Sequence, residues 1–235
     1  MQDRYAGDVG DFGKFALLRA LTPGRTLGVC WYRTDGLGEV NNHGRHLAYL
    51  DRPERFRHLD PGAFDILRSF IGEVRANRCQ RKLEMLEALQ LVPRASYFHG
   101  VLCPKNSAAR LDWACDMWKC MEPADLVFLD PDNGLEGKNL NPKSAALDEL
   151  IKLKRSGRAL LLYHHQSRFV GGAQAEAADI ARRLKEAKFE AVKGIRLRPY
   201  SSRFYFLIDA DEELENRFEH FFRSWEKEAQ FFRLV

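Results

Sequence analysis

The sequence predicts an α/β protein in which helices cover both faces of a mostly parallel, Rossmann-like central sheet. Short apolar segments without polar alternation, such as 125–129 and 159–163, are typical of strands buried on both faces. Amphipathic segments separate these strands along the chain. Near the end, the strand-like segments 189–198 and 203–208 have only a turn between them. The predicted architecture is therefore a three-layer sandwich with a C-terminal antiparallel hairpin.

The predicted helices and strands alternate along the whole chain. Each helix is identified by apolar residues at helical spacing, and each strand by a short apolar run. Pro, Gly, Asp and Ser residues mark most of the ends. We expect helices over 11–21, 107–121, 144–156, 174–187 and 212–228, two more helices within 60–91, and strands over 26–32, 96–102, 125–129, 159–163, 189–198 and 203–208.

Nothing in the sequence indicates a boundary between domains. The chain has 235 residues, 45% of them apolar, which is enough for one full core. No repeat or Pro/Ser-rich linker interrupts it. We therefore expect a single domain over residues 1–235 with a helical insertion at about 60–92. The apolar and aromatic content excludes a disordered chain, and the scattered Gly and Pro residues exclude a coiled coil.

Charge is unevenly distributed along the chain. The net charge is +4, but the segment 211–235 has seven acidic and four basic residues, so residues 1–210 carry about +7. A mildly basic body permits a nucleic acid as a partner without requiring one. No apolar run reaches the roughly 18–20 residues of a membrane span, and no signal peptide is recognisable. Five scattered cysteines without a Cys-x-x-Cys pair are typical of reduced thiols. We expect a cytoplasmic protein without a membrane partner, and its oligomeric state stays open.

The sharpest candidate site follows the predicted strand 125–129. In open α/β sheets, ligands bind beyond the carboxyl ends of the strands. Three carboxylates and an amide stand there within seven residues, and we interpret Asp130, Asp132 and Asn133 as candidate catalytic residues. The alternative is a turn whose aspartates cap backbone amides, because Asn-Gly is a favoured turn pair. The segment reads Asp130-Pro131-Asp132-Asn133-Gly134-Leu135-Glu136.

A Gly-x-Gly segment follows the strand predicted over 26–32. Glycines at a strand-to-helix turn let the backbone approach a nucleoside cofactor closely. Asp35, Gly36 and Gly38 are therefore candidate cofactor-binding residues. A solvated loop is the alternative, because a Gly-x-Gly pair alone is a weak signal.

The N-terminal segment carries two aspartates and several glycines into the first predicted helix. A helix N-terminus binds anions, and Lys14 lies one turn inside this helix. Asp8, Asp11 and Lys14 are therefore further candidate cofactor-binding residues. Alternatively, Asp8 or Asp11 simply caps the helix.

Two adjacent histidines end the predicted strand 159–163. Neighbouring side chains of an extended segment point to opposite sides, so only one of them is expected to face the rim of the sheet. His164 is the catalytic candidate, as a base, a metal ligand or a base-stacking group, and a structural histidine is the alternative. The candidates for nucleic-acid phosphates are arginines, with solvated side chains as the alternative. These are Arg168, Arg196, Arg198 and Arg203.

The order of these elements resembles the class I S-adenosylmethionine-dependent methyltransferase fold. In that fold a strand leads to Gly-x-Gly, a mid-chain strand ends in Asp-Pro, and an antiparallel hairpin closes the sheet. More narrowly, the segment Gly7-Asp8-x-x-Asp11-Phe12-x-Lys14 is similar to the opening motif of bacterial 23S rRNA adenine-N6 methyltransferases. The chain also resembles a group of uncharacterised bacterial proteins with Gly-Asp-x-x-Asp-Phe and Asp-Pro-Asp-Asn-Gly-Leu-Glu signatures.

This resemblance implies a function and a cofactor. In the rRNA methyltransferases an Asp-Pro-Pro-Tyr motif holds the target amino group and the adenine ring. The matching positions are Asp130, Pro131, Asp132 and Asn133, so Asp132 replaces the second proline and Asn133 the aromatic residue. The implied protein is a methyltransferase-like enzyme that acts on an amino group of a nucleic acid, with S-adenosylmethionine bound over the Gly-x-Gly segment.

The same carboxylates support an alternative function. Asp130, Asp132 and Glu136 can form a hard, oxygen-rich site for Mg²⁺ or Mn²⁺. The two aspartates face one ion only if the loop curls, which the following Asn-Gly pair permits. This interpretation predicts a divalent-metal-dependent nuclease or phosphoesterase. A catalytically inactive α/β binding module is the third hypothesis.

Overall fold

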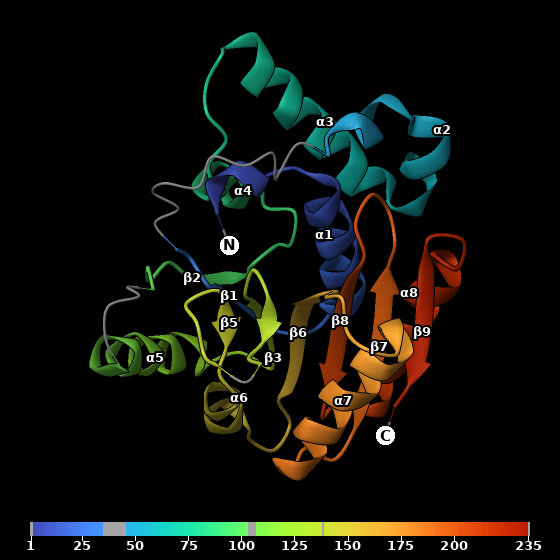
Figure 1. Cartoon of the computed structure of the whole chain (residues 1–235). Helices are drawn as coiled ribbons and strands as arrows, with labels where there is room; N and C mark the ends of the chain where they lie inside the picture. Colours follow the sequence, from blue (N-terminus) through green and yellow to red (C-terminus); the bar gives the residue numbers. More distant parts are fainter. Residues whose placement is uncertain (1, 35–45, 103–106, 138, 235) are drawn as a thin grey trace. The chain divides into compact units, whose positions relative to one another are not determined.

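The computed structural model describes residues 2–34, 46–102, 107–137 and 139–234 (Figure 1). It confirms an α/β fold, in which helices flank a seven-stranded mixed sheet of order β2-β1-β3-β6-β8-β7-β9. Contacts divide the chain into two compact units. The first comprises Met1 with 24–35 and 95–235, and the second comprises 2–23 and 36–94. The expectation of a single domain over residues 1–235 stays a prediction.

Four parallel strands form one end of the sheet in the first unit. Phe128 pairs with Val29 on one side and with Leu161 on the other. The prediction that the strand segments 127–129 and 159–162 are buried, parallel neighbours is therefore confirmed. Because these strands run parallel, their carboxyl ends meet at one rim of the sheet. The strands are β2 (Ser96–Phe98), β1 (Leu27–Trp31), β3 (Leu126–Asp130) and β6 (Ala159–His165).

The other end of the sheet is antiparallel. β8 (Arg203–Ile208) pairs antiparallel with both β6 and β7 (Val192–Leu197). β9 (Ala229–Arg233) adds an outer strand beside β7 that the sequence did not predict. The helix before β9, α8, ends at Ser224, four residues before the predicted end of the helix.

Helices of the first unit cover the two faces of the sheet differently. Apolar residues of α5 (Ser107–Met121), α6 (Leu147–Leu153) and α7 (Gly172–Glu186) form one cluster with strand residues that include Phe232. Phe231 points to the opposite face by strand alternation. Its ring contacts Phe218 and Phe222 of α8 (Glu212–Ser224), so α8 packs on that opposite face.

The second unit is helical. An aromatic cluster joins its parts, because the Tyr49 ring stacks on Phe12 at 5.4 Å and meets Phe64 edge-on at 6.0 Å. The two helices predicted within 60–91 are present. The unit consists of η1 (Asp3–Tyr5), α1 (Val9–Leu21), η2 (Ala48–Asp51), α2 (Pro53–Phe56), η3 (Arg57–Leu59), α3 (Pro61–Ala76) and α4 (Leu83–Ala88). In the described parts of the chain, no helix is long and apolar enough to cross a membrane.

One buried arginine forms hydrogen bonds to the C-terminal ends of two helices of the first unit. Arg158 is only 4% exposed and precedes β6 directly. Its guanidinium donates hydrogen bonds of 2.7–3.0 Å to four carbonyl oxygens at the C-terminal ends of α5 and α6. Carbonyls at the end of a helix lack internal partners, and Arg158 supplies donors to all four. Met121 also accepts from the Ala124 N–H, and Ala124 also accepts from Arg155. The acceptors are Met121, Glu122, Ala124 and Leu153.

We predict that Arg158→Ala lowers the free energy of unfolding by about 2–3 kcal/mol, because charged donors leave several buried carbonyls at once. Urea unfolding followed by circular dichroism measures the effect. Arg182→Ala is the matched control. Among the described residues, this exposed side chain forms ion pairs with Asp179 and Glu186 on its own helix alone. The variant should therefore change the free energy of unfolding little. Equal losses for the two variants would contradict the capping role.

Candidate functional site

Asp130 ends β3 at the rim where the central strands finish. It lies opposite Trp31 of β1 in the register and is 3% exposed. Its side chain shares a sheet face with Phe128, two residues earlier. The ring of Phe128 meets Trp31 edge-on at 6.5 Å. The candidate carboxylate is therefore held next to aromatic surface and is largely removed from bulk water.

The aromatic surface extends across most of the sheet on this face. From Trp31 it continues to Tyr97, whose ring stacks on the indole at 5.9 Å. On the other side Phe128 contacts Tyr205 at 6.4 Å, and Tyr205 meets Tyr163 edge-on at 5.7 Å. Trp31, Phe128 and Tyr205 are 0% exposed, so this row is part of the buried core beside Asp130 and is not open to a ligand.

The segment after Asp130 forms a small two-stranded sheet rather than a simple turn. Gly134 has a positive φ of 99°, which the chain needs to enter β4 (Gly134–Leu135). β4 pairs in parallel with β5 (Ser144–Ala145), where the sequence predicted the start of a helix. Asp132 is half-buried and Asn133 is exposed. The backbone N–H of Asn133 donates to the carbonyl of Lys143 at 2.8 Å.

His164 is fixed by partners on both ring nitrogens. Its Nδ1 accepts a hydrogen bond from the backbone N–H of Leu135 at 3.2 Å. Its Nε2 lies 3.3 Å from Oε1 of Glu176, so the proton belongs on Nε2 and is donated to this carboxylate. A Cβ at Gly134 would collide with the imidazole. His164 thus connects β4 to α7, while His165 is exposed, as alternation predicts.

Glu176, which bonds His164, is a buried carboxylate that the sequence analysis did not single out. It is 2% exposed, and its Oε1 also accepts from the backbone N–H of Ser167 at 2.9 Å. Within the described chain its Oε2 is buried without a hydrogen-bond partner. Desolvation acts to raise the pKa of Glu176, but the hydrogen bonds from His164 and Ser167 outweigh it and hold this pKa below its ordinary value. The sequence feature that could have identified Glu176 is its position in the apolar stripe of α7, which continues at Ile180 and Leu184.

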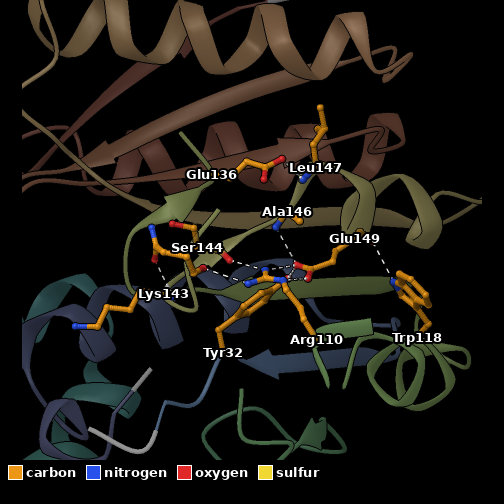
Figure 2. Close-up of polar contacts among 10 residues, drawn as sticks. Tyr32, Arg110, Trp118, Glu136, Lys143, Ser144, Ala146, Leu147 and Glu149 are labelled. Carbon is orange, nitrogen blue, oxygen red and sulfur yellow. Dashed lines mark hydrogen bonds and ion pairs between the residues drawn. The ribbon is translucent and has the colours of Figure 1, made fainter. Parts of the chain in front are cut away.

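A buried ion pair lies below the loop that follows Asp130 (Figure 2). Nε and Nη2 of Arg110 on α5 bind the two carboxylate oxygens of Glu149 on α6 at 2.8 and 3.1 Å. The Tyr32 hydroxyl and the Ala146 N–H each donate to Glu149 Oε2 at 2.9 Å. Burial and the adjacent carboxylate raise the pKa of Tyr32 well above its ordinary value, so its hydroxyl stays a donor.

The same arginine holds the loop itself. Nη1 and Nη2 of Arg110 donate to the carbonyls of Asn141 and Ser144 at 3.1 and 2.7 Å. Lys143, which pairs with Asn133 through its carbonyl, lies between these two residues. The ion pair therefore fixes the backbone at Asn141 and Ser144, and Figure 2 shows the bond from Arg110 to Ser144.

Glu136 has a structural partner in the described chain. Its Oε1 accepts from the N–H of Leu147 at 2.9 Å, at the first residue of α6. The metal hypothesis places this carboxylate beside Asp130 and Asp132. In the described ranges, no group of three His, Cys, Asp or Glu side chains is positioned to hold a metal ion.

The candidate Gly-x-Gly loop lies outside the described residues, and this applies to Asp35, Gly36 and Gly38. The chain is described up to Thr34, whose Oγ1 is buried. Among the described residues this hydroxyl has no hydrogen-bond partner. A buried hydroxyl without a partner is costly, so the end of β1 offers one polar group for a ligand.

The N-terminal candidates belong to the second unit and have local partners there. Asp8 is the N-cap of α1, and its Oδ1 accepts from the N–H groups of Gly10 and Asp11 at 2.7 and 3.2 Å. Asp11 accepts from Gly7 N–H and from Lys14 Nζ, each at 2.8 Å. The capping alternative for Asp8 is therefore confirmed, and Lys14 forms a buried ion pair with Asp11.

The four candidate arginines differ in exposure. Arg168 and Arg198 are exposed, although Arg198 also donates to the carbonyl of Lys227 at 2.9 Å. Arg196 is half-buried. Arg203 is 4% exposed and bonds Ser201, so it cannot reach a phosphate without moving, contrary to its expected role.

A scan against protein-family models finds no match, and a search of the curated proteins finds none either.

We predict that Glu149→Met alone costs about 3–5 kcal/mol of unfolding free energy, because it leaves Arg110 buried without its counter-charge. The double variant Arg110→Met/Glu149→Met should lose clearly less than the sum of the single losses. Urea unfolding of the four proteins measures this coupling. Asp65→Ala, which breaks the exposed pair with Arg57, is the control and should have little effect. Additive losses would contradict a coupled pair.

We predict that the difference in unfolding free energy between the wild type and the Glu176→Gln variant depends on pH. Because the folded-state pKa of Glu176 is depressed, its contribution is present above the ordinary pKa of 4.5 and is lost as the pH falls through the lower folded value. Urea midpoints between pH 7 and pH 3 should show a constant difference above about pH 5.5 that narrows below 4.5. A difference that stays unchanged at pH 3 would rule out the carboxylate as its source.

Proposed function

We propose that this protein is a methyltransferase-like enzyme that acts on an amino group of a nucleic acid, with S-adenosylmethionine as the methyl donor. The observation that carries the proposal is Asp130. It is a buried carboxylate at the carboxyl end of a central strand, beside the end of β1 and a row of aromatic rings. The parallel strands that turn antiparallel at one end also agree with the resemblance.

The segment after β1 offers one polar group to a ligand, because the buried Thr34 hydroxyl has no partner among the described residues. By the resemblance, Asp35, Gly36 and Gly38, which lie outside the described residues, would hold S-adenosylmethionine. When bound, this cofactor supplies a methyl group on a positively charged sulfur.

Asp130 would orient the target amine. A carboxylate that accepts a hydrogen bond from the amino group, together with a nearby carbonyl, keeps the nitrogen lone pair localised. Little proton abstraction is then required, and positioning supplies most of the effect. Asn133 is exposed at the start of β4, where its side-chain amide oxygen can contact the same base.

The surrounding groups would hold this geometry. His164 and Glu176 fix the turn at Gly134. Arg110 and Glu149 fix the opposite side of the loop, to which Asn133 is bonded. These four side chains are positioning residues, because their contacts in the described chain are with the fold.

We predict that Asp130→Asn lowers methyl transfer by a factor on the order of 10²–10³, because the variant keeps the shape and loses the acceptor charge. The assay is incorporation of radiolabelled methyl groups from S-adenosylmethionine into unmodified RNA and DNA. Circular dichroism and thermal unfolding confirm that the variant is folded.

Asp132→Asn separates the proposal from the metal hypothesis. Its effect should be mild for methyl transfer, because an amide still accepts a hydrogen bond, and severe if the carboxylate bound a metal ion. Isothermal titration with S-adenosylmethionine and its demethylated product tests the cofactor directly. A wild-type protein that binds neither at millimolar concentration, or a folded Asp130→Asn variant with full activity, would refute the proposal.

A further inference from the structure

Two loops of the first unit lie side by side at the rim beyond β6. Residues 166–171 follow β6, and residues 198–202 join β7 to β8. The backbone N–H of Gln166 donates to the carbonyl of Ser202 at 3.3 Å. Nη1 of Arg196 on β7 reaches Oε1 of Gln166 at 3.4 Å. The surface that these two loops form is called the Phe169–Tyr200 surface below.

Large apolar side chains are exposed on this surface. Phe169 and Tyr200 are 39% and 42% exposed, and Val170 is 91% exposed. Tyr200 also adopts a positive φ of 61°, a conformation that is unfavourable for a bulky residue and comfortable for glycine. The chain thus places an aromatic ring at a strained turn and turns it toward solvent. Strain of this kind is typical of residues that contact a ligand.

The charged residues within the two loops are both basic. Arg168 and Arg198 are exposed beside the apolar side chains. The segments 163–175 and 191–208 contain no aspartate or glutamate at all. Exposed aromatic rings with interleaved arginines are the composition that binds unpaired nucleic acid, since rings stack on bases and guanidinium groups neutralise phosphates.

A half-buried arginine at the base of the surface has one donor without a hydrogen-bond acceptor. The Nε of Arg196 is buried without a hydrogen-bond acceptor in the described part of the chain. Burial and the neighbouring charge of Arg198 both lower the pKa of Arg196. An anionic oxygen at this point would satisfy the donor and relieve the repulsion, which favours a phosphate over an apolar partner.

We propose that the Phe169–Tyr200 surface binds an unpaired strand of nucleic acid, with bases stacked on Phe169 and Tyr200 and phosphates on Arg168, Arg196 and Arg198. This inference rests on the proposed function for its role, which is to hold the strand next to the nucleotide that is methylated. It narrows the substrate class to single-stranded or locally opened nucleic acid.

Fluorescence anisotropy with labelled single-stranded RNA and DNA of about a dozen nucleotides tests the proposal. A duplex of the same sequence is the third probe. Tyr200→Ala should weaken binding of the single strands roughly tenfold, the loss of one base stack, and Tyr200→Phe should retain it. Arg168→Ala should weaken binding and reduce the slope of log affinity against log salt by about one.

Matched controls change an exposed apolar residue and an exposed arginine elsewhere on the first unit. Leu111→Ala removes a side chain that is 57% exposed on α5, and Arg223→Ala removes an exposed arginine on α8. Neither should change binding more than about twofold, because one stack or one phosphate contact accounts for a larger effect. Thermal unfolding of each variant excludes a loss of fold, and Tyr200→Phe controls for the strained turn.

Three outcomes would refute the proposed binding surface. The wild type binds no single strand, the Tyr200→Ala and Arg168→Ala variants bind single strands as the wild type does, or the duplex binds more tightly than either single strand. Titration with S-adenosylmethionine separates this failure from that of the proposed function. If single strands bind in a way that depends on Tyr200 but S-adenosylmethionine does not bind, the proposed surface stands and the methyltransferase proposal is rejected. If S-adenosylmethionine binds but the variants bind single strands as the wild type does, only the proposed surface is rejected.

Discussion

The ion pair between Arg110 and Glu149 determines where the loop after β3 can lie. Each charge is removed from water, at a cost that only well-formed hydrogen bonds can offset. The Glu149 carboxylate accepts from Tyr32 and Ala146 besides Arg110, and the guanidinium donates to two loop carbonyls as well. All of these groups are satisfied together only when α5, α6, Tyr32 after β1 and the loop are correctly placed.

The second constraint acts from the opposite side of the same loop. His164 accepts from the backbone of β4 and donates to Glu176 on α7, so β6 and α7 hold the turn that β4 begins. Among the described residues, neither group hydrogen-bonds to those of the ion pair. Asp132 and Asn133 thus lie on a segment supported at both ends, as a precise binding site requires.

The sequence allowed the central strands to be predicted because their residues are apolar on both faces, which few other structures permit. Capping at Asp8 was also within reach, because it depends on neighbours two and three residues away. β9 and the β4–β5 pair were not predictable, since two- to five-residue strands with mixed polarity gain their order only from distant partners. Arg110 lies 39 residues from Glu149, a pairing that periodicity does not encode.

The partners of the rim residues bear on which chemistry is compatible with this fold. Methyl transfer to an amine needs an acceptor and a localised lone pair, and it does not need a free histidine, so the structural role of His164 is no obstacle to it. Metal-assisted hydrolysis through Glu136 would have to use mainly its second oxygen, because Oε1 accepts the first N–H of α6. The proposed methyl transfer leaves Glu136 in this contact, at the end of the loop that Arg110 holds.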